Sequence, residues 1–268
     1  MLYAISEVKT FVTGLDHPEG VAVGRDGTLY AGGEGGQVYR IASDGSEAEV
    51  IANIGGSCLG ITVDQVQNIY VCDNNRCQVL KVTQQGEVSV FAESVGKRKF
   101  KCPNFSVFDS QGNLYFSDSG AWKEGNGIIC RVRPDGTVDT FAEGPFHFAN
   151  GLALDAEERF LYVVESNRDR VVRLQIKPDG SSGVPETFAE ELARIPTVWC
   201  LTPSKIFMLR PIDQTRFTGL TRTAALSLSA RMKSAQFSAK RLIARLEVPI
   251  STSSLLQILE PGIYRSLT

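Results

Sequence analysis

The chain has 268 residues, of which 43% are hydrophobic and 22% are charged, and its formal net charge is −2. This composition is that of a soluble globular protein that can bury a sizeable core in one large domain or two smaller ones. No apolar run is long enough to cross a bilayer, and the first residues, MLYAISEVKT, lack the basic and apolar regions of a signal peptide. We therefore expect a cytoplasmic protein without a membrane partner.

The first part of the chain contains an internal repeat. Four segments align, and they begin at Pro18, Cys58, Pro103 and Ala149. Each holds four runs of β-branched, aromatic and aliphatic residues, separated by turn signals such as Asp26-Gly27 and Asp135-Gly136. Such Asp-Gly pairs favour hairpins with type I′ turns, in which both central residues have positive φ. Four short antiparallel strands in each repeat of 40-odd residues indicate the blades of an all-β propeller.

The residues just before Pro18 extend the same scheme. Glu7 to Val12 resembles the fourth strand of a repeat, as in Val138 to Ala142. A lone outer strand at the start of a propeller normally completes the last blade and closes the ring. We therefore expect about four blades plus one N-terminal strand within residues 1–196.

One position of the repeat is rich in side-chain oxygen. The residue just before the first strand of each blade is Glu19, Leu59, Asn104 or Asn150, and we call these four the ring positions. The first strands of propeller blades line the central channel, so these residues are expected around one mouth of it. Asn also suits a turn before glycine, but Leu59 occupies the same place without an amide. Converging carboxylate and amide oxygens suit a hard divalent cation such as calcium.

The motifs PEGVAV, FDSQGNLYFSDSG and FANGLALD resemble the gluconolactonase family, which includes senescence marker protein, regucalcin and bacterial lactonases. The resemblance covers residues 7 to about 196. It implies a six-bladed propeller that holds one divalent metal, calcium or zinc, where water opens a small-molecule lactone. It further implies that Glu19 and Asn150 are metal ligands and that Asn104 contacts the substrate, although many members have Asp where this chain has Phe105.

Other polar side chains are weaker candidates. Arg98, in the basic run Lys97 to Lys101, is a candidate contact for a substrate carboxylate or hydroxyl, and the run is too short for a nucleic-acid stripe. His17 and His147 precede Glu19 and Asn150 and are candidates for proton transfer. Asp118 and Glu165 lie near the ends of second strands, where capping a turn is the expected role.

The repeat stops at Pro196. Residues 197–268 hold 3 of the 30 acidic residues, 10 of the 28 basic residues and 2 of the 25 glycines, with 17 Ser or Thr. We expect no blade in this basic, Ser/Thr-rich tail, only a helical propensity over residues 221–247 and poor order. A shifted reading frame is one explanation: codon degeneracy from Pro196 onward permits Asp-Gly-Val-Val-Leu-Asp-Pro-Glu-Gln-Asn-Leu-Tyr-Val-Thr, which reads as a fifth blade.

The frame shift bears on activity, because it would remove the family's third metal ligand. That ligand is an Asp, and Thr197 stands in its place, so the catalytic base is unknown and activity is expected to be impaired. The sequence thus predicts a metal-dependent lactonase, damaged in this chain. Two alternatives stay open: a non-catalytic propeller that binds a small ligand or protein, and a strictosidine synthase-like propeller.

Overall fold

The computed structural model describes residues 8–190, 198–202, 205–209, 255–260 and 263–267. Within these ranges the chain consists of β-strands and turns, with one 3₁₀ turn at Ser166–Arg168. None of the described residues belongs to a helix with the length and apolar character needed to span a membrane. The expected helical propensity of residues 221–247 and the poor order of most of the tail lie outside the described residues.

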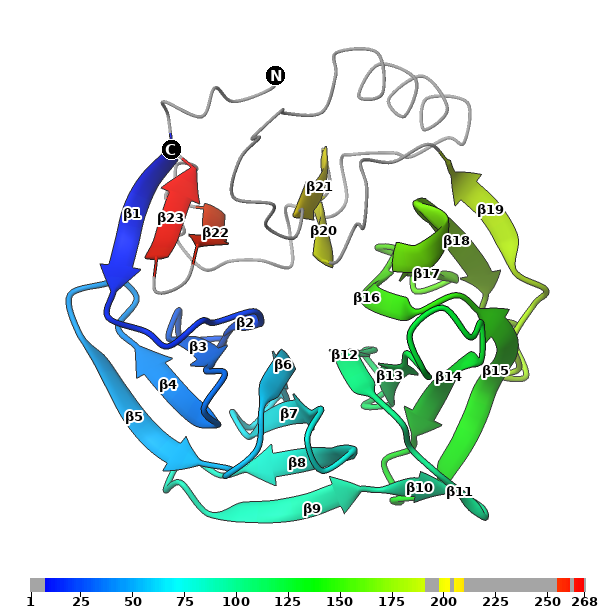
Figure 1. Cartoon of the computed structure of the whole chain (residues 1–268), viewed down its shortest axis with the longest axis horizontal. Helices are drawn as coiled ribbons and strands as arrows, with labels where there is room; N and C mark the ends of the chain where they lie inside the picture. Colours follow the sequence, from blue (N-terminus) through cyan, green and yellow to red (C-terminus); the bar gives the residue numbers. More distant parts are fainter. Residues whose placement is uncertain (1–7, 191–197, 203–204, 210–254, 261–262, 268) are drawn as a thin grey trace.

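Four antiparallel sheets of four strands follow one another along the chain and form most of a ring (Figure 1). Each runs in sequence order from the centre of the ring outward. The first blade is β2 (Val21–Val23), β3 (Leu29–Gly32), β4 (Gln37–Ile41) and β5 (Ala48–Asn53). The second is β6 (Cys58–Val63), β7 (Ile69–Asp73), β8 (Gln78–Val82) and β9 (Val88–Ala92). The third is β12 (Pro103–Phe108), β13 (Leu114–Asp118), β14 (Gly127–Val132) and β15 (Val138–Phe146). The fourth is β16 (Ala149–Leu154), β17 (Phe160–Glu165), β18 (Arg170–Gln175) and β19 (Glu186–Ala189). The predicted all-β propeller blades are confirmed.

The remaining strands form small sheets. A hairpin of β10 (Ser94–Val95) and β11 (Arg98–Lys99) connects the second blade to the third. The N-terminal strand β1 (Val8–Thr13) pairs with β23 (Ile263–Leu267), which pairs with β22 (Leu255–Glu260). Figure 1 shows β1 on the outside of this sheet, as expected for an outer strand that completes a blade.

The described part of the tail forms two hairpins and no four-stranded blade. One hairpin is β20 (Val198–Thr202) with β21 (Lys205–Leu209), and the other is β22 with β23. The sequence analysis did not predict these strands. The segments VWCLT, KIFML, LLQILE and IYRSL are rich in aliphatic and aromatic residues, which favour strands without the Asp-Gly turns of the repeat.

The turns of the blades are built differently from the predicted type I′ hairpins. Gly27 and Gly136 have φ values of 86° and 84°, whereas the aspartates that precede them do not have positive φ. The aspartate instead accepts a hydrogen bond from the backbone two residues on, as Asp26 Oδ1 does from Thr28 N at 3.0 Å. Glycine alone takes the left-handed conformation, so these turns are not type I′.

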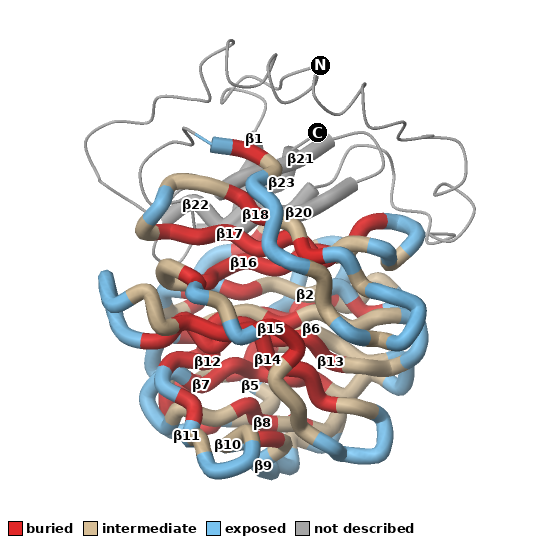
Figure 2. The backbone as a smooth tube through the Cα atoms, turned by 90° about the vertical axis from the view of Figure 1, so that its right-hand side faces the viewer, coloured by how far each residue is buried: buried red, intermediate tan, exposed pale blue. Residues whose placement is uncertain are grey.

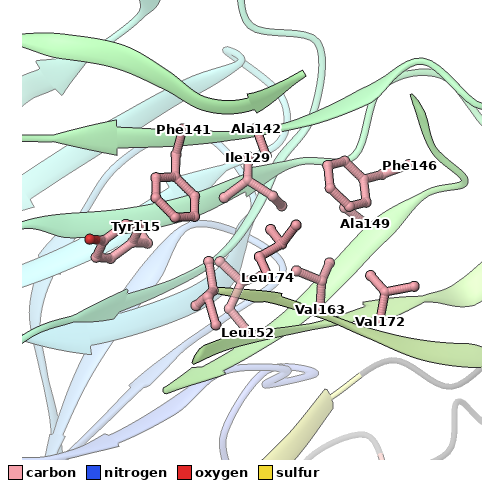
Figure 3. Packing of buried hydrophobic residues seen from close by; sticks show 11 residues of the cluster. Tyr115, Ile129, Phe141, Ala142, Phe146, Ala149, Leu152, Val163, Val172 and Leu174 are labelled. Atoms are coloured by element: carbon pink, nitrogen blue, oxygen red, sulfur yellow. The ribbon is translucent and has the colours of Figure 1, made fainter. Parts of the chain in front are cut away.

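The hydrophobic core lies between neighbouring blades. Figure 3 shows the cluster in which the third and fourth blades meet, where side chains from both sheets interdigitate. It includes Tyr115, Ile129, Phe141 and Phe146 of the third blade and Leu152, Val163, Val172 and Leu174 of the fourth. Equivalent clusters join the first blade to the second and the second to the third. Figure 2 shows the buried residues concentrated in the strands and the exposed ones at the turns.

Buried carboxylates hold the backbone that leads into the inner strands. Asp118 ends β13, is fully buried, and accepts hydrogen bonds from Lys101 N at 3.1 Å and Cys102 N at 2.8 Å. Glu165 ends β17 and accepts one from His147 N at 2.7 Å. The sequence predicted that both residues cap a turn, but their hydrogen bonds reach backbone 16 to 18 residues earlier in the chain. Glu165 makes no side-chain cap hydrogen bond to the 3₁₀ turn that follows it. Each fixes the segment just before β12 or β16, and therefore the start of the strand nearest the centre.

We predict that Asp118→Ala destabilises the protein strongly. Two buried backbone N–H groups would lose their acceptor, and each such loss costs about 1–3 kcal/mol. Urea unfolding followed by tryptophan fluorescence measures the change. Glu49→Ala, which removes an exposed carboxylate paired with Arg40 on the outer strand β5, is the control and should leave the midpoint nearly unchanged. Equal midpoints for the two variants would contradict this role of Asp118.

Candidate functional site

The ring positions lie at the inner ends of four neighbouring blades. Leu59, Asn104 and Asn150 are the second residues of β6, β12 and β16, and Glu19 lies two residues before β2. Figure 1 shows these four strands nearest the centre of the ring. The sequence placed each ring position just before its strand, so the structure shifts three of them into the strand.

A β-bulge explains this shift. In the third blade, Asn104 and Phe105 of β12 lie opposite the single residue Ser117 of β13. The second and fourth blades have the same irregularity at Leu59 and Asn150. A bulge adds one residue to its strand, bends the backbone and changes the direction of a side chain. Simple alternation along the sequence therefore does not predict where these side chains point.

Neighbouring inner strands approach each other closely. A β-carbon on Gly20 would lie 2.4 Å from the carbonyl oxygen of Leu59, and one on Gly60 would lie 2.5 Å from that of Asn104. Both distances are below 3.0 Å, and real β-carbons essentially never lie that close to another heavy atom. Glycine after a ring position thus lets the backbone of the next blade reach it. The ring positions follow one another around the centre in chain order.

The two asparagines are buried, each with 6% of its surface exposed. The Asn150 amide donates from Nδ2 to Ser166 Oγ at 3.3 Å, which leaves Oδ1 as the ligand atom. The Asn104 side chain makes no hydrogen bond to any residue that the structure describes. An amide without a hydrogen-bond partner among the described residues, at the ring position that precedes Asn150, is available to a bound ligand.

Glu19 is the one carboxylate among the ring positions. Glu19 is exposed to solvent, yet protein atoms surround its carboxyl group. The desolvation that they cause raises the pKa of Glu19, and the nearby carboxylate of Glu34 raises it further. No cation among the described residues offsets this charge, so a bound divalent cation would favour the ionised form.

His17 is held by carboxylates beside Glu19. Its Nδ1 lies 2.8 Å from Asp16 Oδ1 and 3.5 Å from Glu34 Oε2. The hydrogen bond to Asp16 is the main reason that the pKa of His17 is raised, although partial desolvation opposes it. The hydrogen bond to Asp16 engages Nδ1 of this imidazole, and a role of His17 in proton transfer stays a prediction.

Arg98 and His147 have protein partners. The Arg98 guanidinium donates to the Asn126 carbonyl oxygen at 3.0 Å and lies 3.7 Å from Asp118 Oδ2. His147 Nε2 lies 3.3 Å from Arg168 Nη2. Arg98 therefore supports the backbone of the third blade, whereas His147 contacts another side chain. Substrate contact by Arg98 and proton transfer by His147 stay predictions.

The described donor set fits part of a site for a hard cation. Glu19, Asn104 and Asn150 offer oxygen only, which suits calcium rather than a thiolate-preferring metal. No group of three or more His, Cys, Asp or Glu is arranged to hold a metal within the described part of the chain. Thr197, at the place of the family's Asp, lies outside the described residues. Glu19 would thus be the single charged ligand.

Ser117 and Ser166 were missed by the sequence reasoning. Both hydroxyls contact Asn150, at its carbonyl oxygen and at its amide nitrogen respectively. A signal was available for Ser117, because the repeated second strands read LYAGG, IYVCD, LYFSD and LYVVE. At the fourth residue of these segments, only the third repeat has a hydroxyl, that of Ser117.

Known proteins share this architecture and parts of the sequence. A solved gluconolactonase from Xanthomonas campestris superimposes with a TM-score of 0.66 at 20% identity, over 75% of this chain and 72% of that one. A chain of a nidogen/laminin complex gives a TM-score of 0.61 at 23% identity, with 71% of each chain covered. At these identities both show a shared fold.

Curated relatives match over a shorter range. Lactonase drp35 of Staphylococcus haemolyticus is 34% identical over 85 residues, which are 31% of this chain and 26% of that protein. The Staphylococcus aureus protein of that name is 34% identical over 80 residues, 30% of this chain and 25% of its own length. The chain therefore spans about a quarter of the length of these relatives.

Family models give the widest match. Residues 11–41 match the N-terminal part of the strictosidine synthase-like proteins. Residues 34–193, more than half of the chain, match the model described as SMP-30/Gluconolactonase/LRE-like region. The fold, the repeated blades and this match show that the chain belongs to the SMP-30/gluconolactonase/LRE-like family.

Proposed function

We propose that this protein is a hydrolase that opens a lactone to the hydroxy acid at the ring positions. The supporting observation is the placement of Glu19, Asn104 and Asn150 at the inner ends of blades in a chain of this family. Gluconolactonase and lactonase are also the names of its relatives. The substrate is a small-molecule lactone, and neither nucleic acid nor a membrane is a partner. A cytoplasmic location stays a prediction.

Each residue has a separate task in this proposal. Glu19 and Asn150 hold one divalent cation, and calcium suits their oxygens better than zinc. When bound, such a cation polarises the lactone carbonyl and stabilises the oxyanion formed as water adds. Asn104, whose amide is buried and free of described partners, hydrogen-bonds the substrate and orients it. The residue that takes the proton from water is not among these three.

A non-catalytic binding propeller is the second candidate. Glu19 is the one carboxylate of the ring positions, and a cation held by a single charge binds weakly. A strictosidine synthase-like activity would need no metal for hydrolysis. Addition of a chelator separates the candidates, because lactone hydrolysis would stop on metal removal, whereas ligand binding by a metal-free propeller would continue.

We predict that the chain binds calcium weakly, with a dissociation constant on the order of 10⁻⁴ to 10⁻³ M. Glu19→Gln should abolish this binding, because the change removes the charge but keeps the shape. Isothermal titration with calcium and with zinc measures it, and hydrolysis of gluconolactone in the presence of a pH indicator reports activity. Glu49→Gln, on the outer strand β5, is the matched control. Calcium binding by the Glu19→Gln variant as tight as that of the parent chain would refute the proposed ligand.

We also predict that Thr197→Asp tightens calcium binding by about 10-fold or more, because calcium affinity follows the number of charged ligands. Lactonase turnover, expected to be slow in the parent chain, should rise with it. The same titration and the same indicator measure both effects. Thr202→Asp, at the other end of β20, is the control for added charge. If Thr197→Asp changes neither affinity nor turnover, impairment by loss of the family's Asp is wrong.

A further inference from the structure

One buried hydroxyl joins the two asparagine-bearing strands at the centre of the ring. Ser117 lies on β13, opposite the bulge of β12, and is fully buried. Its Oγ donates to the carbonyl oxygen of Asn150 at 2.8 Å and accepts from the backbone N–H of Phe105 at 3.1 Å. The Phe105 carbonyl oxygen is farther away, at 3.4 Å, and a hydroxyl has one proton to donate.

Both bonds act on the backbone that carries the candidate ligands. Phe105 follows Asn104 directly in the bulge, and a bulge leaves its extra residue outside the regular ladder. The partly buried N–H group of Phe105 needs another acceptor in that place, and Ser117 supplies it. The second bond reaches Asn150 itself, in the next blade. One side chain therefore fixes the two bulges relative to each other.

No other repeat has a hydroxyl side chain at the position of Ser117. The corresponding residues of the first, second and fourth blades are Gly32, Cys72 and Val164. The hydroxyl occurs only where the ring position of its own blade and that of the next are both asparagine. Beside Leu59 the strand carries Cys72 at this position, and a thiol is only a weak donor and a weak acceptor.

Building on the function proposed above, we propose that Ser117 is a positioning residue. It holds the Asn104 and Asn150 side chains at one separation and direction, so that a substrate bound by Asn104 and a cation held by Asn150 keep a fixed relative placement. It touches neither substrate nor cation, and acts through the two backbone segments that it binds.

The test compares Ser117→Ala with Ser110→Ala. Ser110 also joins the third and fourth blades, because its hydroxyl lies 2.6 Å from Glu158 Oε2, but it does so in the turn after β12, away from the ring positions. The side-chain amide signals of Asn104 and Asn150 are followed by ¹H–¹⁵N NMR of the full chain, with Asn→Asp variants to assign them. We expect both signals to shift or broaden in Ser117→Ala and to stay in place in Ser110→Ala.

Calcium titration gives the second measurement. Outer partners of metal ligands typically contribute about 10–100-fold to affinity, so Ser117→Ala should weaken calcium binding by about 10-fold and Ser110→Ala by less than about 2-fold. If the parent chain binds no calcium, the proposed function fails, and the amide signals still decide the positioning role. The positioning role of Ser117 would be overturned if the amide signals are unchanged in Ser117→Ala, or if both variants move them equally.

Ser117→Cys is the companion variant if Ser117→Ala does not fold. A thiol keeps the size of the side chain but is a weak donor and a weak acceptor. We expect amide signals displaced in the same direction as in Ser117→Ala, with a smaller change in calcium affinity. Parent-like amide signals and affinity in Ser117→Cys would equally overturn the proposal.

Discussion

The rest of the structure depends on backbone-to-backbone contact between the inner strands of neighbouring blades. Gly20 and Gly60 leave no room for a β-carbon against the carbonyl oxygens of Leu59 and Asn104. Any added atom there would push two sheets apart, because protein interiors are close-packed and transmit displacement. The hydrophobic clusters farther out set how the blades stack, but these contacts set how near the ring positions come to one another.

Carboxylates serve three distinct purposes in this architecture. Aspartates in the exposed turns accept backbone hydrogen bonds and shape the turn, as Asp26 and Asp135 do. Asp118 and Glu165 are buried and hold the chain that leads to the centre. Glu19 makes no such bond to a described residue, and its pKa is raised by desolvation and by Glu34. Among the ring positions, this carboxylate is therefore available to a ligand.

The sequence predicts the blades well, because period, alternation and turn residues all act locally. It does not predict the hydrogen bonds of Asp118, whose partners lie 16 and 17 residues earlier in the chain. It does not predict the bulges at Asn104 and Asn150, since an extra residue in one strand is defined only against its partner strand. The prediction of type I′ turns was wrong, because Asp-Gly also suits a turn in which glycine alone has positive φ.

The sequence pattern does not predict contacts between residues that lie far apart in the chain. Arg98 stands in a basic run that suggested a substrate contact, yet its partners are Asn126 and Asp118, 28 and 20 positions away. Ser117 and Asn150 are 33 residues apart, and neither residue type alone indicates the bond. The strands after Pro196 were missed because they carry none of the repeat's turn signals.

The pairing of β1 with β23 also determines the order of events when the chain folds. Val8 faces Leu267, so these two paired strands lie far apart in the sequence. Each blade, by contrast, is assembled from strands adjacent in sequence and needs only short loops to close. Local contacts form faster than distant ones. The blades can therefore form early, while the edge of β1 stays unpaired until the slower contact with β23 forms.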